Sequence, residues 1–229
     1  MKYALFLLGF VATTAWAHDL WFEKEGNTYT LYQGHRHASH DGVDVVPYEA
    51  RMARNFTCID AHGAAEQFGA AKAYPARLSS ECATLHATFS TGYWTKTAWE
   101  TRNVPRTGIS GVVRSWYSEE SLKLVERWTD GSPHPIGAGL EITPTANPLP
   151  LKAGDKLVVL VTDDGKPVAG VPVAYAGNTR GTSGADGKVA IRLRRGGLQL
   201  LEASLESPLA DGKADVAIRT AALQFQIVK

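Results

Sequence analysis

The chain has 229 residues, with 24 lysine and arginine side chains against 23 aspartate and glutamate side chains. This balance argues against nucleic acid or an anionic membrane surface as the main partner. The length is sufficient to bury a substantial core and predicts one large domain or two modest ones.

Residues 1–17, MKYALFLLGFVATTAWA, have the pattern of a secretory signal peptide. A single early charge at Lys2 precedes an apolar stretch, and small residues in the A-x-A arrangement end at Ala17. The apolar stretch is shorter than the roughly 20 residues that a membrane-spanning helix needs, which makes an uncleaved anchor the weaker alternative. We therefore predict a periplasmic protein that is cleaved after Ala17 and whose mature chain begins with His18.

Four of the seven histidines lie in the next segment, AWAHDLWFEKEGNTYTLYQGHRHASHDG. An amino-terminal histidine offers a metal two donors, the α-amine and Nδ1, so cleavage before His18 would create a chelating group. His35 and His37 are two apart in TYTLYQGHRH, an expected strand, and so would share one face at a spacing of about 6.6 Å. His40 follows in an expected turn and could fold back toward the pair.

The predicted metal site therefore consists of His18, His35, His37 and His40. Nearby carboxylates, among them Asp19, could orient the rings. Amine and imidazole donors suit nickel, cobalt, copper and zinc. The alternative is a solvated, pH-responsive patch.

The two cysteines, Cys58 and Cys82, are an even number in an expected oxidising compartment, and this predicts a disulfide. Closing that loop would contribute about 3 kcal/mol. Metal ligation by the pair is less favoured, because neither cysteine has a second one within four residues, as common zinc motifs do.

The middle of the chain combines a strand pattern with one helical pattern. GISGVVRSWY is apolar and β-branched and predicts a strand. In SEESLKLVERW, Ser118 could cap a helix in which Leu122, Val125 and Trp128 recur at three-residue spacing. We therefore expect a short helix there.

The proline-rich segment ITPTANPLPLKAGD separates two differently composed regions. We predict an amino-terminal metal-binding β domain over residues 18–142 and a second domain over residues 143–229. The second region holds DKLVVLVTD, VPVAYAG, GKVAIRLR and ADVAIRTAALQFQIV as strand patterns, with Asp-Gly turns between them. Because it contains no histidine or cysteine, we expect it to support or dock rather than to bind metal.

The fold expected from these patterns is all-β, with two β-sandwich-type domains and at most one or two short helices. The second domain is expected to be an immunoglobulin-like or transthyretin-like sandwich.

Several segments resemble a family of bacterial periplasmic proteins associated with cobalt and nickel uptake. They are AHDLWFE, GYWTKTAWETRNVPRTGISGVVRSWYSEESLKLV, GLEITPTANPLPLKAGDKLVVLVTDDGKPVAGVPV and TSGADGKVAIRL. The resemblance implies two β-sandwich-type domains, nickel or cobalt as the bound metal, and subunits of an energy-coupling-factor type membrane transporter as partners. The three histidines of GHRHASH depart from the simplest family pattern, which leaves copper or zinc open.

Three functions follow as hypotheses. The first is a non-enzymatic protein that captures nickel or cobalt and presents it to a membrane uptake transporter. The second is a copper protein or oxidative copper enzyme with His18 as a histidine brace. The third is a metal-free module whose aromatic side chains bind a protein or glycan. The remaining histidines, His62, His86 and His134, are expected to be structural or solvated, with His86 the best placed to face a site.

Overall fold

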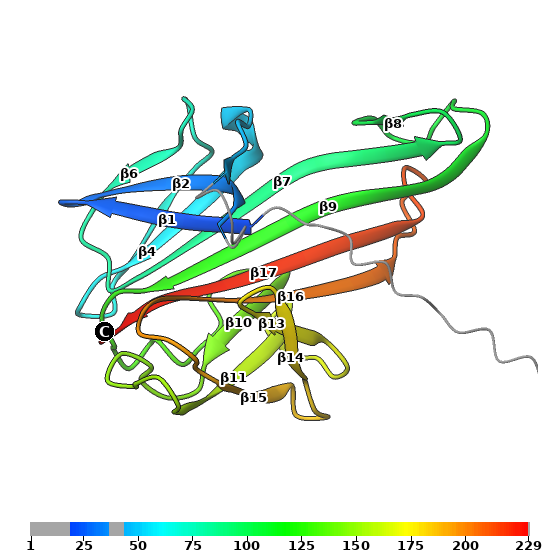
Figure 1. Ribbon diagram of the computed structural model, residues 1–229. Helices are drawn as coiled ribbons and strands as arrows, with labels where there is room; N and C mark the ends of the chain where they lie inside the picture. Colours follow the sequence, from blue (N-terminus) through cyan, green and yellow to red (C-terminus); the bar gives the residue numbers. More distant parts are fainter. Residues whose placement is uncertain (1–18, 37–43, 229) are drawn as a thin grey trace, which may run out of the picture.

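The computed structural model describes residues 19–36 and 44–228, and strands account for nearly all of its regular structure (Figure 1). Within those ranges the only helical segment is the 3-10 turn η1 (Ala50–Met52). The prediction of an all-β protein with at most one or two short helices is confirmed. No helix in the described ranges is long and apolar enough to cross a membrane.

Seventeen strands follow one another along the described chain. They are β1 (Asp19–Glu25), β2 (Thr28–His35), β3 (Asp44–Val45), β4 (Ala53–Ile59), β5 (Ala65–Phe68), β6 (Arg77–Ser79), β7 (Thr84–Thr97), β8 (Thr101–Arg102), β9 (Val112–Val125), β10 (Leu140–Pro144), β11 (Lys156–Asp163), β12 (Lys166–Pro167), β13 (Pro172–Tyr175), β14 (Asn178–Thr182), β15 (Lys188–Arg192), β16 (Gly197–Pro208) and β17 (Val216–Ile227).

The strands form three sheets packed as layers. The central sheet has nine strands in the order β14-β13-β16-β17-β9-β7-β4-β5, with β8 attached to β7. One four-stranded sheet contains β1, β2, β3 and β6, and the other contains β10, β11, β12 and β15. Figure 1 shows these two small sheets on opposite sides of the long strands β7, β9, β16 and β17, so both faces of the central sheet are covered over part of their length.

Each small sheet closes a core of its own against the central sheet. Leu20 and Phe22 of β1 pack with Phe56 of β4 and with Leu122 and Leu124 of β9. On the other side, residues of β10, β11 and β15 pack against β16 and β17, with Ile142, Val159, Ile191, Leu201 and Phe225 fully or almost fully buried. Alternation along β9, β16 and β17 directs side chains into both cores.

The prediction of a helix in SEESLKLVERW is wrong, because this segment is the end of strand β9 and the loop that follows it. β9 pairs with β7 on one side and with β17 on the other. Leu122 and Leu124 enter the first core, while Val125 enters the second and Trp128 packs against it. Because both faces of β9 are buried at this end, its apolar residues do not alternate strictly with polar ones. Their spacing therefore resembles that of a helix.

The predicted boundary between residues 142 and 143 lies within strand β10. Strand β17, from the second half, pairs in parallel with β9, from the first half, along ten residue pairs. The two halves therefore share the central sheet while each contributes most of one core. The division into two domains stays a prediction.

The disulfide between Cys58 and Cys82 is confirmed, with a sequence separation of 24. It links β4 to the segment that leads into β7, and both cysteines belong to the first core. The bond therefore cross-links the part of the central sheet that packs against β1 and β2.

Candidate functional site

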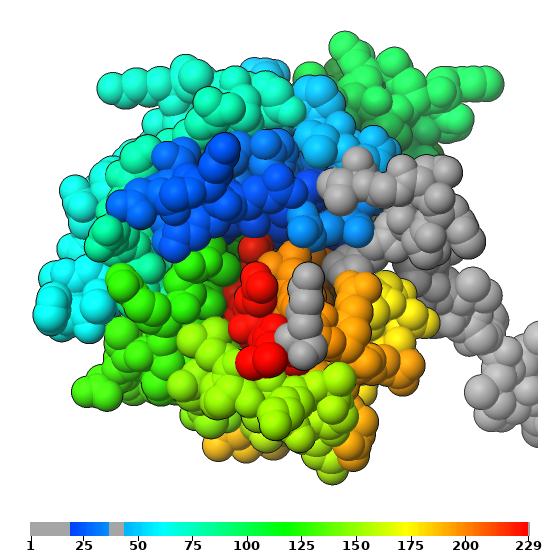
Figure 2. All heavy atoms as spheres, turned by 60° about the vertical axis from the view of Figure 1, so that its left-hand side comes forward, coloured from blue at the N-terminus to red at the C-terminus, as the bar shows by residue number. Residues whose placement is uncertain are grey.

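The position of β1 is set by hydrogen bonds from one side chain of the central sheet. The Gln224 side chain of β17 accepts a bond from the main-chain N–H of Phe22 at 2.8 Å and donates one to its carbonyl oxygen at 2.8 Å. Gln224 is buried, so this pair of bonds is shielded from water. Figure 2 shows the β1–β2 ribbon lying directly against the atoms of β16 and β17.

Three carboxyl groups meet where β1 begins: Asp19 of β1, Glu120 of β9 and Glu202 of β16. We call them the carboxylate cluster. The side chains of Asp19 and Glu202 share a hydrogen bond, and the charge of Asp19 acts on Glu120. Glu120 exposes only 7% of its surface, and Glu202 is half-buried.

The cluster is strongly perturbed because like charges are gathered away from water. Burial, with a smaller contribution from the charge of Asp19, raises the pKa of Glu120 to about 8. Burial, the hydrogen bond that protonated Glu202 donates to Asp19, and the charges of Asp19 and Glu120 raise the pKa of Glu202 to about 9. A cation placed here would relieve the repulsion among these groups and lower both pKa values.

His35 lies at the end of β2, next to Gly34, which pairs with Asp19. A Cβ atom at Gly34 would overlap the carbonyl oxygen of Asp44, so glycine is what allows β3 to approach and pair with His35. The main-chain N–H of Arg36 donates to Asp19 Oδ2 at 2.9 Å. The half-buried His35 is thus the neighbour of Gly34, the residue that pairs with Asp19 of the carboxylate cluster.

Of the four predicted metal ligands, only His35 lies in the described part of the chain. His18, His37 and His40 lie outside it. Within residues 19–36 and 44–228, no three histidine, cysteine, aspartate or glutamate side chains are arranged to hold a metal ion.

A second polar group of residues, in the central sheet, was not predicted. His86 of β7 pairs with Lys123 of β9, and Lys123 faces Glu141 of β10. Lys123 Nζ donates to Glu141 Oε1 at 2.9 Å, to Thr143 Oγ1 at 3.1 Å and to the carbonyl oxygen of His134 at 2.7 Å. The side chains of Lys123 and Glu141 expose 0% and 1% of their surface, so this is a fully buried ion pair.

The ion pair anchors the loop between β9 and β10. The main-chain N–H groups of Ile136 and Gly137 donate to Glu141 Oε2 at 2.9 Å and 2.8 Å. Gly137 lies against the His86 ring so closely that an added Cβ would stand 2.3 Å from its Cε1 atom. Among the residues that the structure describes, His86 Nε2 has no hydrogen-bond partner, and it lies 3.9 Å from Glu141 Oε2. The loop therefore packs directly on the ring, with no room for a side chain at position 137.

The buried imidazole gives the fold a dependence on acidity. Burial lowers the pKa of His86, and although the charge of Glu141 opposes this, the shift remains downward. A pKa below that of the unfolded chain means that the stability from neutral His86 is complete above pH of about 6.5 and is lost as the pH falls.

We expect the free energy of unfolding of the wild-type protein to fall between pH 6.5 and pH 5 more steeply than that of His86→Gln. The glutamine variant cannot take up a proton at this position, so the difference between the two proteins should shrink as the pH falls. Urea denaturation at several pH values measures it. His62→Gln, at an exposed position, is the matched control. Parallel pH profiles for the wild type and His86→Gln would contradict the prediction.

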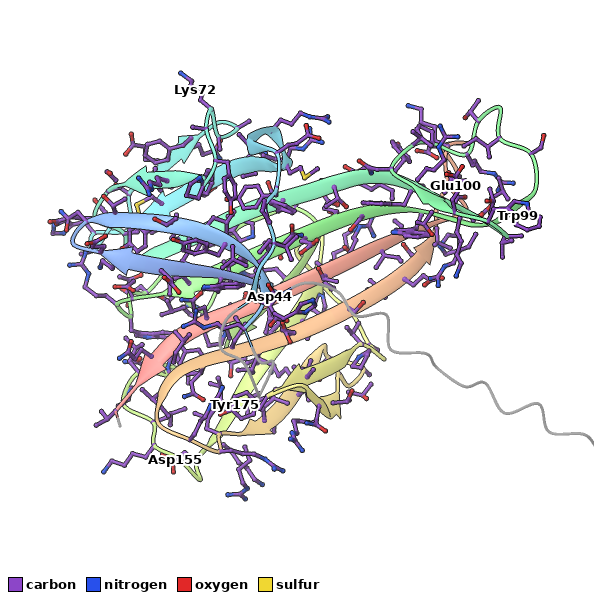
Figure 3. All side chains as sticks on the ribbon, turned by 45° about the horizontal axis from the view of Figure 1, so that its top comes forward. Asp44, Lys72, Trp99, Glu100, Asp155 and Tyr175 are labelled. Atoms are coloured by element: carbon purple, nitrogen blue, oxygen red, sulfur yellow. A yellow bond between two sulfur atoms is a disulfide. The ribbon has the colours of Figure 1, made fainter. Side chains whose placement is uncertain are left out.

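The remaining histidines and the aromatic side chains are spread over the molecule. His62 and His134 are exposed. Trp21 is fully buried, and its ring stacks on Tyr32 with 5.7 Å between centroids. Trp94 and Trp116 stack at 6.2 Å, and the exposed Trp99 lies at the tip of the β7–β9 hairpin (Figure 3). The tryptophans of the described residues therefore form no single binding face.

Comparison with known proteins places the chain in a family. A family model described as a domain of unknown function, DUF4198, matches residues 15–207. The chain belongs to the DUF4198 family. The DUF4198 match includes all three residues of the carboxylate cluster as well as His86, Lys123 and Glu141, and it continues across the predicted boundary at residue 142. No curated protein and no solved structure matches the chain.

Proposed function

We propose that this chain is a periplasmic protein that binds a divalent transition metal, nickel or cobalt, at its processed amino terminus. It presents that metal to a membrane uptake transporter without catalysing a reaction. The observation that carries the proposal is the carboxylate cluster. One member of the cluster, Asp19, directly follows His18 in the chain. The pKa values of Glu120 and Glu202 are raised, and a cation bound at this end of β1 would lower both.

In this proposal the α-amine and imidazole of His18 and the imidazole of His35 are first donors, and His37 and His40 complete the set. These nitrogen donors suit nickel and cobalt, and the segments quoted above resemble proteins of cobalt and nickel uptake. In this proposal the nitrogen donors, not the carboxylate cluster, are the metal's ligands, in agreement with the arrangement of the described acidic side chains. The disulfide supports an oxidising compartment.

Isothermal titration of the protein that begins at His18 tests the proposal. We expect saturable binding of nickel or cobalt at neutral pH, and at least tenfold weaker binding, about 1.4 kcal/mol, when one alanine precedes His18. The extension converts the α-amine of His18 into a peptide amide, which can no longer donate, and leaves every side chain in place. His35→Ala should weaken binding further, whereas His134→Ala, at an exposed position, is the control.

Two results would contradict this function. Absence of saturable binding of any first-row divalent metal would exclude the metal-binding role. Oxygen consumption by the copper-loaded protein in the presence of a reductant would support an oxidative copper enzyme instead.

A further inference from the structure

The loop between β9 and β10, residues 126–139, covers part of strand β7. Leu85 and Ala87 of β7 enter the first core, so alternation along the strand places His86 on the opposite face of the central sheet. On that face Gly137 lies against the His86 ring, and Ser132 Oγ lies 3.4 Å from Thr84 Oγ1. We call residues 126–139 the covering loop.

The buried ion pair holds the covering loop in place. Glu141 accepts hydrogen bonds from the main-chain N–H groups of Ile136 and Gly137, and Lys123 donates to the carbonyl oxygen of His134. The strands beneath the loop, β7 and β9, are instead joined to each other by a long ladder of paired residues. A change at Glu141 therefore acts on the loop first, because local opening there disrupts fewer contacts than separation of the strands.

The His86 side chain is buried without the hydrogen bond that its ring nitrogen could form. His86 exposes 2% of its surface, and in residues 19–36 and 44–228 its Nε2 atom finds no partner. Buried polar groups are almost always hydrogen-bonded, so this one calls for an explanation. Glu141 Oε2 lies 3.9 Å from Nε2, which is too far for a hydrogen bond, and it already accepts from Ile136 and Gly137.

Protonation of His86 places a second cation beside a single carboxylate. The charges that act on the ring are those of Glu141 from β10 and Lys123 from β9. Lys123 is the direct partner of His86 across the strands, and like charges in that position repel. The partner on β4, Thr57, is uncharged, and the side chain of His134 in the covering loop is exposed. An imidazolium here needs either the carboxylate oxygen that holds the loop or the water that the loop excludes.

We propose that protonation of His86 releases the covering loop from the central sheet. The imidazolium draws Glu141 Oε2 away from the N–H groups of Ile136 and Gly137, and departure of the loop lets water reach the ring. Burial acts to raise the pKa of Glu141, but the charge of Lys123 and smaller contributions bring it below its ordinary value. Glu141 therefore stays ionised while His86 titrates, and the loop is an acid-sensitive cover over the polar network.

The direction of the pH dependence follows from the burial of His86. Burial, with a smaller contribution from Lys123 and against the charge of Glu141, lowers the pKa of His86 while the loop is closed. Water restores the ordinary value of 6.5 when the loop opens, so the open form binds the proton more tightly. The ratio of open to closed loop is therefore constant above pH of about 6.5 and rises by up to about tenfold for each pH unit below it. None of this depends on the proposed metal binding.

Hydrogen exchange followed by NMR tests the inference in the wild-type protein. The observables are the protection factors of the Ile136 and Gly137 amides, corrected for the pH dependence of intrinsic exchange. We expect both to fall at least about tenfold between pH 7 and pH 5, while amides of the β16–β17 ladder keep their protection. His86→Gln should abolish the fall, and the shorter His86→Asn is measured alongside it in case one variant does not fold.

His134→Gln is the matched control, because it removes the imidazole of the covering loop itself and should leave the fall intact. Unchanged protection of the two amides in the wild-type protein would overturn the inference. So would an equal fall in a folded His86 variant, or the loss of the fall in His134→Gln, since either result assigns the acid response to another group. An equal fall in the β16–β17 amides would show unfolding of the whole chain and would also overturn it.

Discussion

Replacing Lys123 with methionine is expected to lower the free energy of unfolding by about 3 to 5 kcal/mol. The substitution removes the positive partner of Glu141, whose side chain exposes 1% of its surface. Burial alone acts to raise the pKa of Glu141, but the charges of Lys123 and His86 and the N–H of Gly137 together lower it. Without Lys123 the carboxyl must either remain an unpaired buried charge or take up a proton at a cost.

Chemical denaturation of a set of variants separates this effect from lost packing. Lys123→Met/Glu141→Gln should recover most of the stability, because the amide carbonyl still accepts from Ile136 and Gly137 and no charge is left unpaired. Lys188→Met is the control, since Lys188 and Asp186 form an exposed pair at 3.8 Å that contributes about 0 to 1 kcal/mol. A loss below about 1 kcal/mol for Lys123→Met would show that the pair is not what holds the loop.

Most strands were predictable because their sequences alternate between buried and exposed positions. Lys188–Arg192 is a clear example, with Val189 and Ile191 buried between exposed neighbours. The Asp-Gly turn was equally readable, since Asp164 and Gly165 both adopt positive φ, at 50° and 73°. These features depend only on neighbouring residues.

The polar network was not predictable, because its members come from three strands. His86 and Lys123 face each other only through the register of β7 with β9, and Glu141 joins them from β10. Local patterns do not specify such pairings. A signal was nevertheless present: Lys123 stands among apolar residues in SLKLV, and a strand with two buried faces would have required a buried partner for it.

The carboxylate cluster shows the same limit at the candidate site. The sequence directed attention to histidines and to Asp19, which is one member of the cluster. Glu120 was read as part of a helix, and Glu202 belongs to the region expected to serve only for support or docking. The parallel pairing of β17 with β9 brings the two halves together, so the second half contributes directly to the site.

Replacing Glu120 with glutamine is expected to stabilise the protein by roughly 3 kcal/mol at pH 7. Burial and, to a smaller extent, the charge of Asp19 raise the pKa of Glu120 to about 8 from its ordinary value of 4.5. A raised pKa in the folded state means that the carboxyl's contribution to stability is complete below pH 4.5 and is lost as the pH rises through about 8. Glutamine does not ionise, so the gain should be small at pH 5 and largest near pH 8.5.

Urea denaturation at pH 5, 7 and 8.5 measures this gain, with Glu206→Gln, at an exposed position of the same strand as Glu202, as the control. A gain that is independent of pH would show that folding does not raise the pKa of Glu120 and would contradict the prediction.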